Sequence, residues 1–183
     1  SAETQGKLSF TSRDGSVIIL YRECASAARI PFYVRSIFLR EVIGIHHDKS
    51  SAFGGRKRMK KVVKFGGSSL ASADQFKKVG AIILEDENRR YVVPSAPGKR
   101  FSSDTKVTDM LYACYDTAVK GDDFSVQLEN IKARYQEIID GLALDCSLDE
   151  DFEIIRKNFQ NKAGADYAAS RGEFLNGKIM SSY

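Results

Sequence analysis

A short apolar strand pattern that runs directly into two glycines, and then into a helix pattern, constrains the fold of this sequence more than any other feature. Residues 60–65 carry Val62 and Val63 at their centre, and β-branched residues in such a short run are typical of a buried strand. Gly66 and Gly67 then interrupt the run. The sequence therefore predicts a strand, a tight turn and a helix in immediate succession.

The helix pattern covers residues 73–85. Ser72 and Gln75 have the spacing of a capping box, in which the serine side chain accepts a hydrogen bond from the helix backbone. Apolar residues then recur at spacings of three and four, which places them on one face of the helix: Phe76, Val79, Ile82 and Ile83.

Strand and helix patterns continue along the chain. Residues 90–93 suit a second strand, which residues 94–98 end with two prolines and a glycine. Helical spacing of apolar residues then predicts helices over 106–119, 123–142 and 149–161. We interpret the aromatic residues of these helices as packing residues, because their spacing matches a buried helix face and not a cofactor site.

The strand–glycine–helix unit has the chemistry of a phosphate site. Glycine lets backbone N–H groups approach phosphate oxygens closely, and a helix N-terminus adds partial positive charge. Lys64, at the end of the strand, could supply a full charge during phosphoryl transfer. The GxxxxGK[ST] spacing of a Walker A loop is absent. On these residues alone a plain tight turn remains the alternative.

Four polar residues farther along the chain have ordinary interpretations when each is taken alone. Ser95 and Thr108 suit a turn and a helix cap. Arg171 and Glu173 lie in a helical segment, where such residues are usually solvated charges.

Three motifs in order resemble those of the aspartokinases, within the amino-acid kinase family. Residues 64–69 (KFGGSS) are similar to the KFGG[ST]S signature. Ser95-Ala96, followed by residues 107–109 (VTD), resembles the strand end and helix start that come next in that family. Residues 170–173 (SRGE) resemble its Ser-x-Gly-Glu motif, and the whole resemblance covers residues 59–183.

The resemblance implies an α/β fold, a three-layer αβα sandwich with a mainly parallel sheet, truncated at the C-terminus. It implies ATP-dependent phosphorylation of the β-carboxylate of L-aspartate, the first step toward lysine, threonine and methionine, with ATP and Mg²⁺ as cofactors. It also implies a homo-oligomer in the full-length enzyme. Because the family's later catalytic region and regulatory domains are not in this sequence, we expect the 183-residue chain alone to be inactive.

The resemblance also implies a role for each motif residue. Lys64 would bridge the ATP phosphates and stabilise the transferred phosphoryl group. The residues that would line the phosphates with it are Phe65, Gly66, Gly67 and Ser68. The residues that would meet aspartate are Thr108, Glu173, Ser95 and Arg171, with Glu173 on the amino group.

The sequence departs from the commonest aspartokinase pattern at two places. Pro94 stands where many members have an ordinary strand residue, and residues 97–100 (PGKR) form a basic loop. The resemblance leaves open how this loop contacts the substrate.

The first 58 residues differ in composition from the rest. They carry ten Lys/Arg against five Asp/Glu, whereas residues 59–183 carry 18 against 19. Residues 54–58 (GGRKR) could be encoded by a purine-rich ribosome-binding site just before Met59. We therefore predict that residues 1–58 are a poorly structured upstream extension or non-native leader. A genuine N-terminal extension and a rearranged fragment are the alternatives.

Other classes of function are less well supported by the sequence. Another amino-acid kinase, acting on glutamate, acetylglutamate or uridylate, fits the motifs less well. A non-catalytic protein whose basic first segment contacts nucleic acid would need residues 56–61 to be ordered and exposed beside other cations. The excess positive charge lies in residues 1–58, and the remainder is close to neutral. The three cysteines are not clustered as metal ligands are. No apolar run is long enough to span a bilayer, so we expect a cytoplasmic protein without nucleic-acid or membrane partners.

Overall fold

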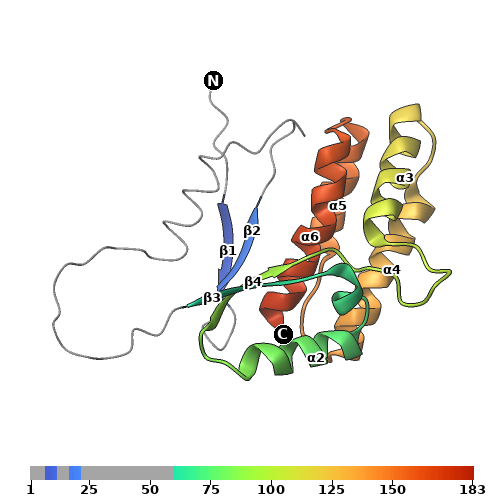
Figure 1. The fold of residues 1–183 in the computed structure, drawn as a ribbon. Helices are drawn as coiled ribbons and strands as arrows, with labels where there is room; N and C mark the ends of the chain where they lie inside the picture. Colours follow the sequence, from blue (N-terminus) through green and yellow to red (C-terminus); the bar gives the residue numbers. More distant parts are fainter. Residues whose placement is uncertain (1–6, 12–16, 22–59) are drawn as a thin grey trace, which may run out of the picture.

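The computed structural model describes residues 7–11, 17–21 and 60–183 (Figure 1). Residues 1–58, which we predict to be a poorly structured leader, lie largely outside the described residues. Within that range, Lys7–Thr11 forms strand β1 and Val17–Tyr21 forms strand β2.

One four-stranded sheet organises the described residues. Strand β3 (Lys61–Phe65) and strand β4 (Arg89–Pro94) pair in parallel, with Val63 opposite Val92. The other edge of β4 pairs in parallel with β2, and β1 adds to β2 in the antiparallel sense, so the strand order is β1-β2-β4-β3. Strand β4 is therefore a central strand, and its end and the end of β3 lie side by side.

Helices follow the strands in the predicted order. A 3-10 turn, η1 (Gly67–Leu70), leads from β3 into α2 (Ala73–Leu84), and β4 is followed by the helices that Figure 1 shows standing together beside the sheet. These are α3 (Val107–Lys120), α4 (Ser125–Gly141), α5 (Asp149–Gln160) and α6 (Ala165–Ser182). The predicted α/β class with a mainly parallel sheet is confirmed, and the arrangement is consistent with an αβα sandwich.

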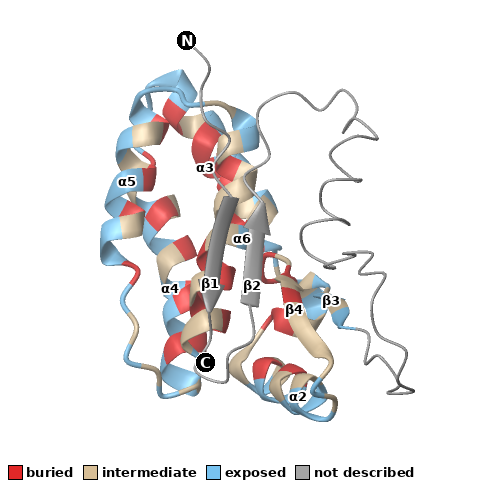
Figure 2. Cartoon of the chain, turned by 90° about the vertical axis from the view of Figure 1, so that its left-hand side faces the viewer, coloured by how far each residue is buried: buried red, intermediate tan, exposed pale blue. Residues whose placement is uncertain are grey.

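The core lies where the inner faces of α3 to α6 meet, as the buried residues in Figure 2 show. Helix α6 also packs against β2 and β4 and joins this core to the sheet. The apolar faces predicted for the helices over 123–142 and 149–161 are buried throughout; their members are Phe124, Leu128, Ile131, Tyr135, Ile138, Ile139, Phe152, Ile155 and Phe159. Periodicity therefore located the interior of the helical layer correctly.

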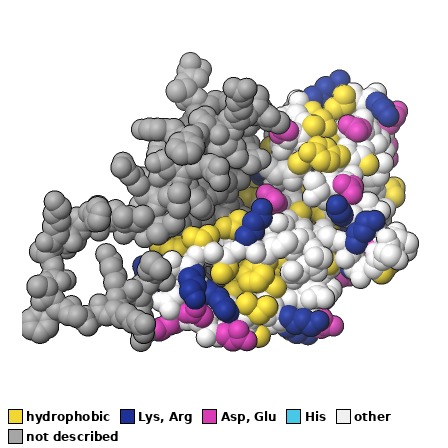
Figure 3. Space-filling view, in the orientation of Figure 1, with side chains coloured by type: hydrophobic (Ala, Val, Ile, Leu, Met, Phe, Trp, Pro, Cys, Tyr) yellow, Lys and Arg dark blue, Asp and Glu magenta, His cyan; other side chains and the backbone are white. Residues whose placement is uncertain are grey.

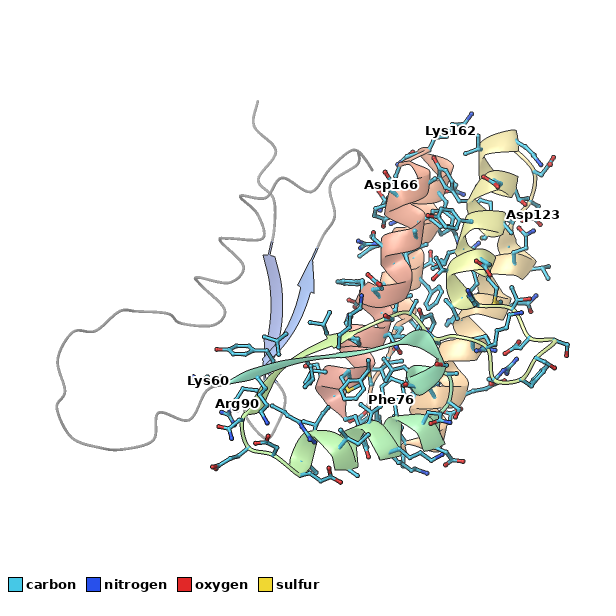
Figure 4. The ribbon with its side chains drawn as sticks, in the orientation of Figure 1. Lys60, Phe76, Arg90, Asp123, Lys162 and Asp166 are labelled. Carbon is cyan, nitrogen blue, oxygen red and sulfur yellow. The ribbon has the colours of Figure 1, made fainter. Side chains whose placement is uncertain are left out.

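Helix α2 begins where the sequence predicts, but one residue of its predicted buried face is exposed. The Ser72 hydroxyl accepts a hydrogen bond from the Gln75 N–H at 3.4 Å, as a capping serine does. Phe76 and Val79 are buried, and Figure 4 shows Phe76 directed from α2 toward the end of α6. Ile82, however, is 41% exposed, because it lies at the edge of the face that contacts the core.

The Asp86 carboxylate, in the turn before β4, links the start of β4 to the start of β3. The Asp86 carboxylate accepts hydrogen bonds from Lys61 Nζ at 2.6 Å, from the Asn88 backbone at 2.9 Å and from Asn88 Nδ2 at 2.8 Å. These donors, with Lys61 the strongest, hold the pKa of Asp86 well below its usual range. The ionised carboxylate therefore stabilises the fold.

We expect Asp86→Asn to lower the free energy of unfolding at neutral pH and to have a shrinking effect in acid. Because the folded-state pKa is depressed, the contribution is complete above the unfolded pKa of about 4 and is lost as the pH falls below it. Urea unfolding of both proteins at neutral pH and at steps below pH 4 measures this difference. Asp116→Asn, at an exposed position on α3, is the control, and a difference that grows in acid would contradict the prediction.

Candidate active site

The ends of the two parallel strands are joined through their loops. The Ser95 N–H donates to the Phe65 carbonyl at 3.1 Å, which extends the pairing past the end of β4. The Gly98 N–H then donates to the Gly67 carbonyl at 2.8 Å. The loop after β3 and the loop after β4 are therefore held in contact at the carboxyl edge of the sheet, where open α/β sheets bind their ligands.

The contact between these loops requires glycine on both sides. A Cβ on Gly67 would lie 2.8 Å from the Ala96 carbonyl oxygen, and one on Gly98 would lie 2.6 Å from the Gly67 carbonyl carbon. Both obstacles are backbone atoms, which cannot rotate away. By contrast, a Cβ on Gly66 would meet no described atom within 4 Å, and the φ of Gly66 is −76°. The two adjacent glycines thus have different structural requirements.

A cleft of about 500 Å³ opens at this edge of the sheet. Its walls come from the loop after β3, the loop between β4 and α3, the first turn of α3, and α6. The lining residues are Gly67, Ser68, Ser95, Ala96, Pro97, Gly98, Lys99, Lys106, Thr108 and Glu173. Five of the nine predicted site residues, from three separate motifs, therefore line one cleft.

Thr108 enters the cleft at the start of a helix. The N-terminus of α3 has no side-chain cap: Lys106 occupies the cap position, and the Val107 N–H donates to the Pro97 carbonyl at 3.1 Å. The N–H groups of Thr108 and Asp109 have no acceptor among the residues that the structure describes. This end of α3 thus presents a hydroxyl, two N–H groups and the helix dipole to the cleft.

Glu173 reaches the cleft from α6 because a glycine precedes it. A Cβ on Gly172 would lie 2.7 Å from Ala96 Cβ, so the absence of a side chain lets α6 approach the loop after β4. The Tyr135 hydroxyl donates to the Gly172 carbonyl at 2.8 Å and holds α6 in this position. Burial raises the pKa of Tyr135 well above its usual value, so this hydroxyl remains a donor.

Three residues of the predicted phosphate site lie beside the cleft and do not line it. Lys64 and Gly66 are exposed, and Phe65 is half-buried against the core. The Lys64 ammonium group makes no hydrogen bond or ion pair with other residues in the described part of the chain. It lies on β3, three residues before Gly67, so it is close in sequence to the cleft.

Arg171 does not line the cleft, although the resemblance implies that it lies near the substrate. Its guanidinium lies 4.5 Å from the centre of the Tyr167 ring and 4.8 Å from that of Phe174, and it donates to Ser170 Oγ. Residues two apart in a helix point to nearly opposite sides, and of this pair only Glu173 lines the cleft. The role of Arg171 near the substrate stays a prediction.

Five lining residues were not among the predicted site residues: Ala96, Pro97, Gly98, Lys99 and Lys106. All belong to the loop between β4 and α3, whose basic character is visible in the sequence. Both lysines are exposed, and Glu173 is the only carboxylate among the lining residues, so the cleft carries net positive charge. A loop with a lysine near each end, between two predicted site residues, was the signal that could have identified them.

Two negative observations apply to the described residues alone. They contain no group of three or more His, Cys, Asp or Glu side chains placed to hold a metal ion. None of their helices is long and apolar enough to cross a membrane.

On the face seen in Figure 3, acidic and basic side chains are interspersed over the helices and the sheet edge.

Part of this chain is similar to known aspartokinases. No protein-family model matches the chain. Aspartokinase 3 of Bacillus subtilis is 39% identical over 129 residues, which cover 67% of this chain and 28% of that protein. The crystal structure of Clostridium acetobutylicum aspartate kinase matches with 50% identity and a TM-score of 0.65 over 67% of this chain and 28% of that one.

Escherichia coli aspartokinase III, in complex with aspartate and ADP, also matches, with 26% identity over 67% of this chain. Its TM-score of 0.46 is too low for the match to bear on the fold. The chain spans little more than a quarter of the length of each of these relatives. Over about two-thirds of its own length, this chain is a homologue of the aspartokinases.

Proposed function

We propose that this chain carries the part of an aspartate kinase that holds L-aspartate and the phosphates of ATP. The observation that carries the proposal is the single cleft that gathers Ser68, Ser95, Thr108 and Glu173 from three motifs separated in sequence. Homology to aspartokinases over two-thirds of the chain supports it. The reaction would yield aspartyl phosphate and ADP in a cytoplasmic enzyme whose full-length form is a homo-oligomer.

The charges of the cleft suit an acidic amino acid. Aspartate carries two carboxylates and one ammonium group at neutral pH. Glu173 is a suitable partner for the ammonium group, and Lys99 and Lys106 provide positive charge for carboxylates. The Thr108 hydroxyl and the N–H groups at the start of α3 that have no acceptor among the described residues add neutral donors.

The proposed transfer needs positioning more than acid–base chemistry. The β-carboxylate of aspartate is already ionised at neutral pH, so it can attack the γ-phosphorus while the bond to the β–γ bridging oxygen breaks. ATP supplies the phosphoryl group, and Mg²⁺ would offset the charge of its phosphates. Lys64, Gly66, Gly67 and Ser68 would hold these phosphates through one ammonium group and backbone N–H groups. Because Mg²⁺ is commonly bound through phosphates and few carboxylates, it would enter with the nucleotide.

A chimaeric enzyme tests the proposal. Residues 60–183 replace the matching part of Bacillus subtilis aspartokinase 3, and aspartyl phosphate formation from ATP and L-aspartate is measured by trapping the product as a hydroxamate. We expect Lys64→Met to lower kcat by about 100-fold or more, because a cation at the transferred phosphoryl group is lost. We expect Thr108→Val to raise the KM for aspartate by about tenfold, the effect of one hydrogen bond.

Two matched substitutions control this experiment. Lys60 lies at the opposite end of β3 from the cleft (Figure 4), and Thr117 lies on α3 with its hydroxyl donating to the Ala113 carbonyl at 3.0 Å. Lys60→Met and Thr117→Val should leave both kinetic constants unchanged. Full activity of the Lys64→Met chimaera, or a preference of the parent chimaera for glutamate, acetylglutamate or uridylate, would overturn the proposal.

The two adjacent glycines provide a second test. Gly67→Ala should lower the free energy of unfolding by about 1–3 kcal/mol, because its Cβ meets the backbone of Ala96 and Gly98. Gly66→Ala should leave the free energy of unfolding unchanged or raise it by up to about 1 kcal/mol, since its φ suits alanine and the space around it is open. Urea unfolding of the 183-residue chain measures both.

The same Gly66→Ala substitution separates ligand binding from folding. If ATP phosphates lie against the backbone at Gly66, the added methyl group should raise the KM for ATP in the chimaera without loss of stability. An unchanged KM for ATP would show that the phosphates do not approach this glycine.

A further inference from the structure

The loop between β4 and α3 forms most of the cleft and has no regular structure of its own. It spans residues 95–106 and supplies six lining residues, including both lysines. A segment without helix or strand hydrogen bonds depends on the rest of the protein for its shape. The contacts that hold it therefore determine where its lysines and the start of α3 lie.

A buried arginine holds this loop at two points. Arg134 lies on α4 and is only 5% exposed. Its guanidinium donates to the Gly98 carbonyl at 3.0 Å and forms an ion pair with Asp104, near the other end of the loop. Arg134 is not a lining residue of the cleft. It acts on the cleft only through the loop.

Asp104 receives this contact within the loop itself. Its carboxylate, 10% exposed, also accepts hydrogen bonds from Arg100 Nε at 2.8 Å and from the Arg100 backbone at 3.0 Å. Arg100 in turn donates to Glu137 of α4 at 2.6 Å. Arg100 and Arg134 hold the pKa of Asp104 well below its usual range, so the carboxylate is ionised at neutral pH. Two arginines and two carboxylates thus join the loop to α4.

Stability alone is a poor explanation for this arrangement. Removing a guanidinium from water is costly, and an apolar residue of similar size often stabilises a fold equally well. Arg134 Nε also has no hydrogen-bond partner within the described structure. The fork of the guanidinium, however, fixes the distance and orientation between Gly98 and Asp104, which an apolar side chain cannot do.

We propose that Arg134 is a positioning residue of the cleft, which sets the shape of the 95–106 loop and so places Lys99, Lys106 and the start of α3 for an acidic amino acid. The part of this inference that concerns the ligand rests on the proposed function. The part that concerns the loop rests on the contacts of Arg134 alone.

The test uses the full 183-residue chain and two measurements. Amide hydrogen exchange reports the order of residues 98–106, and an NMR titration with L-aspartate reports affinity. Arg134→Met should raise exchange in this loop and weaken aspartate binding by about tenfold, since small displacements of binding groups have effects of this size or larger. Arg134→Lys keeps the charge and one contact, so it should recover part of both losses.

Arg156→Met is the matched control. Arg156 lies on α5, is paired with Glu129 and Glu153, and is not among the lining residues. Its loss should not change exchange in the loop or aspartate affinity. If Arg134→Met does not fold, Asp104→Asn removes the same ion pair from the loop side and replaces it in the test.

The outcomes separate this inference from the proposed function. Unchanged exchange over residues 98–106 in Arg134→Met, or in Asp104→Asn where it replaces that variant, would overturn the inference. The same holds if Arg156→Met gives an equal rise in exchange. Failure of the unaltered chain to bind aspartate, together with a rise in loop exchange confined to the Arg134 and Asp104 variants, would support the positioning role and count against the proposed function.

Discussion

The contact between Gly67 and Gly98 is the constraint on which the rest of the site depends. Two parallel strands bring their carboxyl ends together, and the loops that leave them can only touch because neither glycine carries a side chain. With the loops in contact, a serine from the first and a serine from the second line the same cleft. A wider separation would leave two unrelated turns at the edge of a sheet.

Much of the fold could be predicted from sequence because its signals are local. Two β-branched residues before a glycine pair marked β3, the spacing of Ser72 and Gln75 marked the start of α2, and apolar periodicity marked the buried faces of the later helices. The cleft was predictable in part for a different reason. The resemblance to aspartokinases selected Ser68, Thr108 and Glu173, which no local pattern would have connected.

Contacts between residues that are far apart in the chain could not be predicted from the sequence. An arginine in an amphipathic helix reads as a solvated charge, and only the fold shows that Arg134 is buried against a loop thirty residues earlier in the chain. The same limitation applies to Arg171, which the motif places near the substrate and which does not line the cleft. Helix geometry turns Arg171 toward Tyr167 and Phe174 while Glu173 faces the cleft.

Helix α4 supplies no lining residue, yet it supports two walls of the cleft through consecutive residues. Arg134 holds the loop after β4 by the Gly98 carbonyl, and Tyr135 holds α6 by the Gly172 carbonyl. Both contacts are buried hydrogen bonds to backbone, so neither depends on the side chains that would meet a ligand. The polar lining residues Ser68, Lys99 and Glu173 can therefore remain exposed, and the start of α3 can lack a side-chain cap, because the rigidity that they need comes from a helix behind them. This separation of support from lining is why a substitution in α4 should change the cleft without touching it.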